Sequence, residues 1–171
     1  MGMDKLVAPL LRVPLFVGLR PLQLTELARQ AERVKFHRGH VITEAGRSGD
    51  AAFLIASGAA GRIEPAGSDG EVEPIEPGSL VGEMAMLVEH VYRATVIACD
   101  RVLCLKITRA AVHAQMAEDA ALARHFERRI RERLARVAKD LRQIDGVLAA
   151  CGTGELNPDA RSQQTGSADA A

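Results

Sequence analysis

Residues 34–107 consist of short β-rich runs separated by glycines, and few folds are compatible with this sequence pattern. Eight runs recur at turn spacing, which is the pattern of a double-sheet jelly roll. The predicted strands cover residues 34–36, 41–43, 51–56, 61–63, 72–75, 80–81, 94–98 and 102–107. Residues 67–70 have the composition of a hairpin turn. We therefore predict an α+β, mainly β, fold built on an eight-stranded jelly-roll β-barrel.

Apolar residues at helical spacing come before and after this β-rich region. Residues 3–12 and 21–33 are predicted helices, the second with Pro21 at a favoured first-turn position. Thr108 and Asp119 are typical N-caps for a helix that runs to Met116 and for a longer one after it. We expect four parts: N-terminal helices (1–33), a barrel (34–107), C-terminal helices (108–149) and a disordered tail (150–171).

Apolar residues recur along the long predicted helix with two different spacings. From Leu122 to Leu134 the apolar residues recur every four positions, as on a helix that lies on a globular body. Beyond that point they alternate spacings of three and four, which is a heptad seam. The seam consists of Leu134, Val137, Leu141, Ile144 and Leu148. Because no later segment can cover it, we predict a homodimer through this helix, and packing back onto the barrel is the alternative.

Composition narrows the class of protein. The 171 residues, 47% of them hydrophobic, suffice for one core, and 22 basic residues balance 22 acidic ones. Three cysteines without paired spacing and no apolar run of about 20 residues predict a cytoplasmic protein outside the membrane. Residues 124–142 hold eight basic against three acidic side chains, which we interpret as a solvated face beside the seam. Nucleic acid is therefore not an expected partner.

One motif carries chemical information. It consists of Gly82, Glu83, Met84, Ala85, Tyr92, Arg93, Ala94 and Thr95. A glycine and an acidic residue that open a short helical turn leave backbone N–H groups aimed in one direction, which suits a phosphate. A nearby arginine would add positive charge, and the Glu83 carboxylate is a good acceptor for a sugar hydroxyl. This combination indicates a site for a small anionic nucleotide.

These residues resemble the phosphate-binding cassette of cyclic nucleotide-binding domains, the family of the catabolite activator protein, kinase regulatory subunits and nucleotide-gated channels. The resemblance runs from about Leu11 to Ile144. It includes Pro14-Leu15-Phe16, Phe36-His37-Arg38-Gly39-His40, Glu44-Ala45-Gly46, Gly49-Asp50 and Pro77-Gly78. It implies cAMP or cGMP as ligand, no cofactor, no enzymatic activity and Glu83 on the ribose 2′-hydroxyl. It also implies a purine cap from the long helix, for which Phe126, Arg128, Arg129 and Arg133 are candidates.

The sequence departs from the family at the phosphate arginine. The family has Arg-x-Ala-Thr where this chain has Tyr92-Arg93-Ala94-Thr95, so the arginine comes one residue late. On a strand, a shift of one residue moves a side chain to the opposite face, which would point Tyr92 at the pocket and Arg93 outward. Alternatively, a bulge within residues 89–91 would turn Arg93 back inward. Both outcomes stay open at this level.

We predict a stand-alone, non-enzymatic sensor of cAMP or cGMP that signals to a protein effector through its C-terminal helix, without a helix-turn-helix domain. The first alternative is a degenerate dimeric scaffold that binds no nucleotide, and a second is a sensor of another anion admitted by Tyr92. A jelly-roll metalloprotein is a further alternative, since His37, His40 and Glu44 lie in the β region. Their spacing puts the two histidines on opposite strand faces, which disfavours a metal site. Cys99 and Cys104 are interpreted as small buried strand residues.

Overall fold

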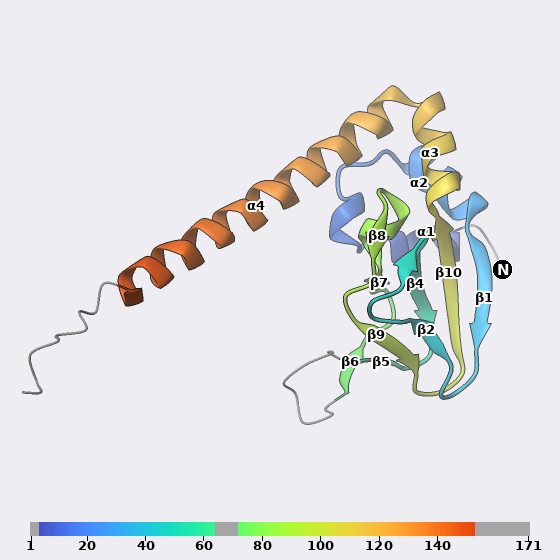
Figure 1. Ribbon diagram of the computed structural model, residues 1–171. Coiled ribbons are helices and arrows are strands. Elements are labelled where there is room, and N and C mark those ends of the chain that lie inside the picture. Colours follow the sequence, from blue (N-terminus) through green and yellow to red (C-terminus); the bar gives the residue numbers. More distant parts are fainter. Residues whose placement is uncertain (1–3, 64–71, 153–171) are drawn as a thin grey trace, which may run out of the picture. The chain divides into compact units, whose positions relative to one another are not determined.

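Two antiparallel four-stranded sheets dominate the computed structural model, which describes residues 4–63 and 72–152 (Figure 1). One sheet has the order β1 (Glu32–Phe36), β10 (Val102–Thr108), β4 (Ala51–Ser57) and β7 (Leu80–Val81). The other has the order β2 (Val41–Thr43), β9 (Thr95–Ala98), β5 (Ala60–Ile63) and β6 (Glu73–Ile75). Two further two-residue strands, β3 (Ser48–Gly49) and β8 (His90–Val91), pair only with each other.

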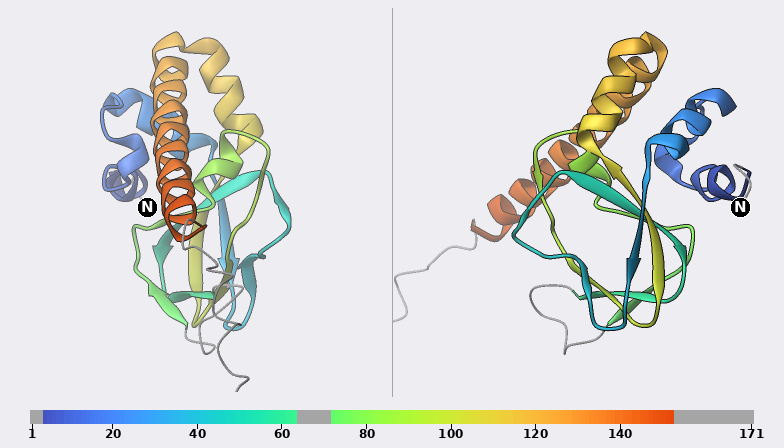
Figure 2. Two further views of the ribbon diagram at one scale, coloured as in Figure 1. Left: turned by 60° about the vertical axis from the view of Figure 1, so that its left-hand side comes forward. Right: turned by 90° about the vertical axis from the view of Figure 1, so that its right-hand side faces the viewer.

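The two sheets face each other across a shared apolar core (Figure 2). Side chains from both sheets meet there because alternate residues of a strand point to one face. The core contains Ile42, Ala51, Phe53, Ile55, Ala60, Ile75, Val81, Val96, Ala98, Val102 and Cys104. The predicted mainly β fold of jelly-roll type, with N-terminal helices and a long C-terminal helix, is confirmed. Cys104 is buried as predicted, whereas Cys99 lies exposed just past the end of β9.

Three short helical segments precede the sheets. They are α1 (Asp4–Leu10), the 3-10 helix η1 (Pro14–Phe16) and α2 (Pro21–Gln30). α2 ends earlier than the apolar spacing predicts, because Ala31 is extended and Glu32 already pairs with Lys106 on β10. Cross-strand pairing therefore overrides local helix propensity at this point.

Both predicted N-caps after the sheets are confirmed. The Thr108 hydroxyl accepts a hydrogen bond from the backbone N–H of Ala111 at 3.2 Å and begins α3 (Arg109–Glu118). One Asp119 carboxylate oxygen accepts the N–H groups of Ala121 and Leu122 at 2.8 and 3.1 Å and begins α4 (Ala120–Gly152). Each side chain satisfies N–H groups that the helix itself leaves unpaired.

The chain divides into two compact units, residues 1–129 and 130–171, so the second part of α4 is described by itself. There the predicted seam is exposed: Leu134 is 62%, Val137 46%, Leu141 57% and Ile144 54% accessible. The side chain of Leu148, the hairpin at 67–70 and residues 153–171 of the predicted tail lie outside the described residues. None of the helices in the described ranges is long and apolar enough to cross a membrane.

Candidate functional site

The cassette begins where β7 ends. Gly82 has a φ of +71° in the left-handed region and starts the 3-10 helix η2 (Glu83–Met86). A side chain at position 82 would be strained at this φ, so glycine is the residue that suits the turn. Ala85 and Met86 are fully buried and fix η2 against the first unit's core, while Glu83 and Met84 are half-buried. The cassette is therefore a short, rigidly anchored turn with Glu83 at its start.

The phenol ring of Tyr92 lies directly over this turn. A Cβ atom built on Gly82 would lie 2.6 Å from Cε1 of Tyr92, and one built on Gly49 would lie 2.8 Å from the same atom. The Tyr92 hydroxyl donates a hydrogen bond to the carbonyl oxygen of Ala51 at 2.8 Å. Two glycines without side chains thus provide the space that the ring fills.

Arg93 takes the opposite direction. The backbone of Tyr92 continues the pairing of β3 with β8, since its N–H donates to Arg47 O and its carbonyl accepts from Gly46 N, both at 2.9 Å. Arg93 is exposed and forms no hydrogen bond or ion pair among the described residues. Of the two arrangements open from the sequence, the structure has Tyr92 at the cassette and Arg93 on the outer face.

Tyr92 brings no positive charge to the site. Burial of its ring raises the pKa of the phenol above its usual value, and the negative charge of Asp50 raises this pKa further. The hydroxyl is therefore neutral at pH 7. Where the family has a guanidinium, this chain presents a neutral aromatic side chain.

Ala94 and Thr95 lie beside the cassette with their polar groups already engaged. The Thr95 hydroxyl accepts a hydrogen bond from Ala45 N at 3.1 Å, and the Ala94 carbonyl accepts one from the Thr43 hydroxyl at 3.3 Å. The first bond joins β9 to the segment after β2, and the second joins the end of β2 to the residue before β9. Thr95 thus has a structural task in this conformation.

Two side chains that sequence reasoning missed anchor the cassette from α3. The Arg109 guanidinium donates to Val88 O at 3.0 Å and to Gly49 O at 3.3 Å. The His113 ring lies 2.7 Å from Leu87 O, and its Nε2 is the donor because a carbonyl only accepts. An arginine in the first turn of a helix opposes the helix dipole, and this unfavourable placement is the signal that could have found Arg109.

Two of the four expected purine-cap residues on the long helix, Phe126 and Arg129, are engaged in other contacts. Phe126 is fully buried and meets Phe16 edge to face at a centroid distance of 6.3 Å, so its ring belongs to the core. Arg129 donates to Val17 O at 3.0 Å. Arg133 lies in the second unit, which is described by itself.

The histidines of the alternative metal site are close to each other but lack further ligands. His37 and His40 meet edge to face with ring centroids 5.6 Å apart. Within the described residues, no group of three or more histidine, cysteine, aspartate or glutamate side chains is placed to hold a metal ion.

Known proteins share part of the sequence of this chain. A family model described as the cyclic nucleotide-binding domain matches residues 33–119, which include β1, the cassette and α3. The CRP-like cAMP-activated global transcriptional regulator of Mycobacterium tuberculosis is 25% identical over 144 residues, 83% of this chain. A cAMP-dependent protein kinase regulatory subunit of Aspergillus niger is 31% identical over 97 residues, 57% of this chain.

The similarity extends to three dimensions. A solved cyclic nucleotide-binding-like protein from Brucella abortus superposes with a TM-score of 0.60 at 29% identity, and covers 68% of this chain and 100% of that one. The present chain spans 63% of the mycobacterial regulator and 23% of the fungal subunit. The chain thus matches only part of each of these two relatives.

Proposed function

This chain belongs to the cyclic nucleotide-binding domain family, and we propose that it is a non-enzymatic, cytoplasmic regulatory module that binds cAMP or cGMP. The observation that carries the proposal is the left-handed Gly82 followed by η2 with Glu83 at its start, within the matched residues. The names of both relatives refer to cAMP, which supports the same ligand class.

Each predicted ligand-binding residue has a role in this proposal. Glu83 accepts a hydrogen bond from the ribose 2′-hydroxyl, and the backbone of Gly82, Met84 and Ala85 lies against the phosphate. Tyr92, Ala94 and Thr95 form the facing wall. Arg93 joins the site only if the segment after β8 turns over when the ligand binds, because the side chain is exposed in the present conformation.

Binding has to move the Tyr92 ring. A phosphate that settles over Gly82 and Gly49 occupies the volume of the phenol, so the ring turns out and its hydrogen bond to Ala51 breaks. The site also lacks the charge-assisted contact of the family arginine. The loss of that contact alone weakens the affinity by about tenfold to a hundredfold relative to a site with the arginine in register, and displacing the ring adds to this cost.

We further propose that the module signals as a homodimer through α4 to a protein effector. Leu134, Val137, Leu141 and Ile144 form one exposed apolar face of the helix at heptad spacing. Such a seam becomes stable when a second helix covers it. Ligand binding shifts the equilibrium between two arrangements only by the difference of its affinity for them.

Calorimetric titration of the purified chain with cAMP and with cGMP tests the nucleotide proposal. We expect saturable binding of one of the two, and its loss in Glu83→Ala. Arg62→Gln is a matched control, because Arg62 lies on β5, where it pairs with Glu73 at 3.2 Å. The proposal would be overturned if neither nucleotide gave a heat of binding while the variant and the wild type were equally folded by circular dichroism.

A second candidate function is favoured by the position of Tyr92. The ring fills the space over the two glycines and its hydroxyl is hydrogen-bonded to Ala51. In that case the chain is an interaction scaffold that retains the fold and has lost the nucleotide. The same titration separates the two candidates.

A further inference from the structure

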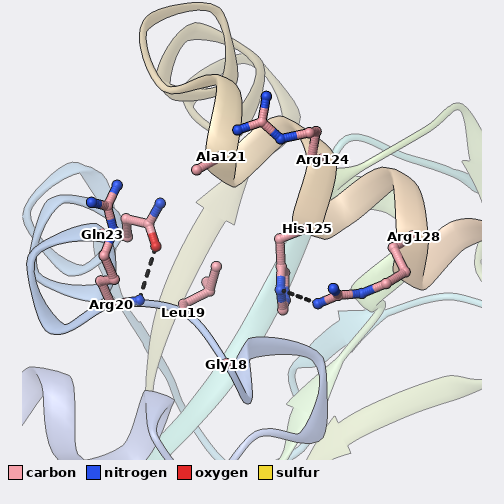
Figure 3. Close-up of a pocket in the computed structure, with 8 residues that line it drawn as sticks. All are labelled: Gly18, Leu19, Arg20, Gln23, Ala121, Arg124, His125 and Arg128. Carbon is pink, nitrogen blue, oxygen red and sulfur yellow. Dashed lines mark hydrogen bonds between the residues drawn. The ribbon is translucent and has the colours of Figure 1, made fainter.

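A cavity of about 410 Å³ lies in the first unit between the segment before α2 and the first three turns of α4 (Figure 3). It shares no lining residue with the cassette. Gly18, Leu19 and Ala121 form its apolar part. Arg20 enters from the N-terminal side, while Arg124 and Arg128 enter from α4, and no carboxylate lines it.

The floor of this cavity is built by His125, which is only 5% exposed. One ring nitrogen, Nε2, lies 2.8 Å from Leu15 O, and the other, Nδ1, lies 3.3 Å from an Arg128 guanidinium nitrogen. Arginine only donates, so Nδ1 is the acceptor and Nε2 carries the proton that Leu15 O accepts. This contact holds the Arg128 guanidinium at the cavity.

The adjacent carboxylate, Asp119, does not neutralise the cavity. One of its oxygens accepts from the Gln23 amide at 2.7 Å and from Arg20 at 3.4 Å, while the other caps α4. Asp119 thus offsets Arg20 and the positive end of the helix. Arg124 makes no hydrogen bond or ion pair in the described part of the chain, so the cavity keeps a positive charge.

We propose that this cavity binds a small phosphate-bearing metabolite, with the phosphate between Arg124 and Arg128 and the organic part against Leu19 and Ala121. Two guanidinium groups suit a phosphate better than a single carboxylate, because a phosphate has three strong acceptor oxygens and a charge of about −1.5 to −2. The volume exceeds that of inorganic phosphate and falls within the range of small-molecule sites. A bound ligand would join the segment before α2 to the start of α4.

An NMR titration tests this site. The probes are pyrophosphate and ribose 5-phosphate, added to ¹⁵N-labelled full chain at constant ionic strength, and the signals followed are the amides of Gly18 and Leu19. We expect saturable shifts below about 10 mM and an affinity reduced about tenfold in Arg124→Gln. Because Arg124 makes no hydrogen bond or ion pair among the described residues, Arg124→Gln removes none of these interactions.

Arg136→Gln is the matched control, since Arg136 is exposed on the same helix outside the cavity. Equal weakening by Arg124→Gln and Arg136→Gln would mean general attraction to basic surface and would overturn the site. The absence of saturable shifts up to about 10 mM would also overturn it. Because the shifts are expected to persist in Glu83→Ala, this test is independent of the cassette.

Discussion

The Tyr92 hydroxyl and the Ala51 carbonyl are joined by a 2.8 Å hydrogen bond that holds the phenol ring over the cassette. The ring rests where Gly82 and Gly49 leave room for it. Because the next residue, Arg93, points outward, the cassette combines the family's backbone with a neutral aromatic side chain. The side chain that faces the cassette is therefore set by a single register step in the sequence.

Tyr92→Arg should raise the affinity for the bound cyclic nucleotide by at least about tenfold. The substitution removes the ring from the cassette and supplies a charge at the position that faces Gly82. Calorimetry measures the effect, with Arg93→Gln as the control that should change the affinity little. A loss of binding in Arg93→Gln as large as in Glu83→Ala would show instead that Arg93 turns inward with the ligand.

Gly49→Ala should lower the free energy of unfolding by about 1–3 kcal/mol, because the added Cβ overpacks the site. That atom would lie 2.8 Å from both Cε1 of Tyr92 and Cβ of Ala85. Urea denaturation gives the change in stability. In a Tyr92→Ala background the same substitution should cost less, and an equal cost in both backgrounds would contradict the packing of the ring on Gly49.

Leu141→Lys should convert the proposed dimer into a monomer. Leu141 is 57% exposed at the middle of the seam, and a charge at a core heptad position opposes helix pairing. Light scattering at micromolar concentration gives the mass, and Gln143→Lys adds the same charge outside the seam as a control. A wild-type mass equal to that of one chain would contradict the proposed dimer.

Asp119 should make the fold sensitive to acid. The Gln23 hydrogen bond, followed by the capped N–H of Leu122, holds the pKa of this carboxyl below its usual value. A group with a lowered folded pKa stabilises the protein fully above its unfolded pKa of about 3.9, and this contribution is lost as pH falls through the folded pKa.

Urea midpoints measured from about pH 6 down to about pH 2.5 test this dependence. Asp119→Asn keeps a capping oxygen but cannot titrate, so its stability should fall less over this window than that of the wild type. Gln23→Ala should reduce the acid dependence in part, because it removes the largest cause of the lowered pKa. Identical slopes for all three proteins would refute the assignment.

Local patterns predicted much of this fold. The eight predicted strands all coincide with observed ones to within two residues at their ends, and Thr108 and Asp119 cap the helices as expected. The β3–β8 pair was missed because a two-residue strand has too short a pattern to recognise. The end of α2 was placed too late because the pairing of Glu32 with Lys106 connects residues far apart in sequence.

One part of the candidate site could likewise be predicted from the sequence, and another part could not. Strand alternation correctly indicated that Tyr92 faces inward if Val96 does, and Val96 is indeed buried. Nothing local in the sequence connects Tyr92 with Gly49 or Ala51, which are 43 and 41 residues away. Likewise, the bond between His125 and Leu15 spans 110 residues, so the arginine-lined cavity emerges only from the folded chain.

Cys104 gives the molecule a built-in reporter. Its thiol is buried on β10, and this burial raises its pKa to about 12, so the thiol is protonated at pH 7. Alkylating reagents attack the thiolate, so they should modify exposed Cys99 within minutes and reach Cys104 only when the sheets separate. The rate of Cys104 labelling would then measure how fast the two sheets separate, without any introduced probe.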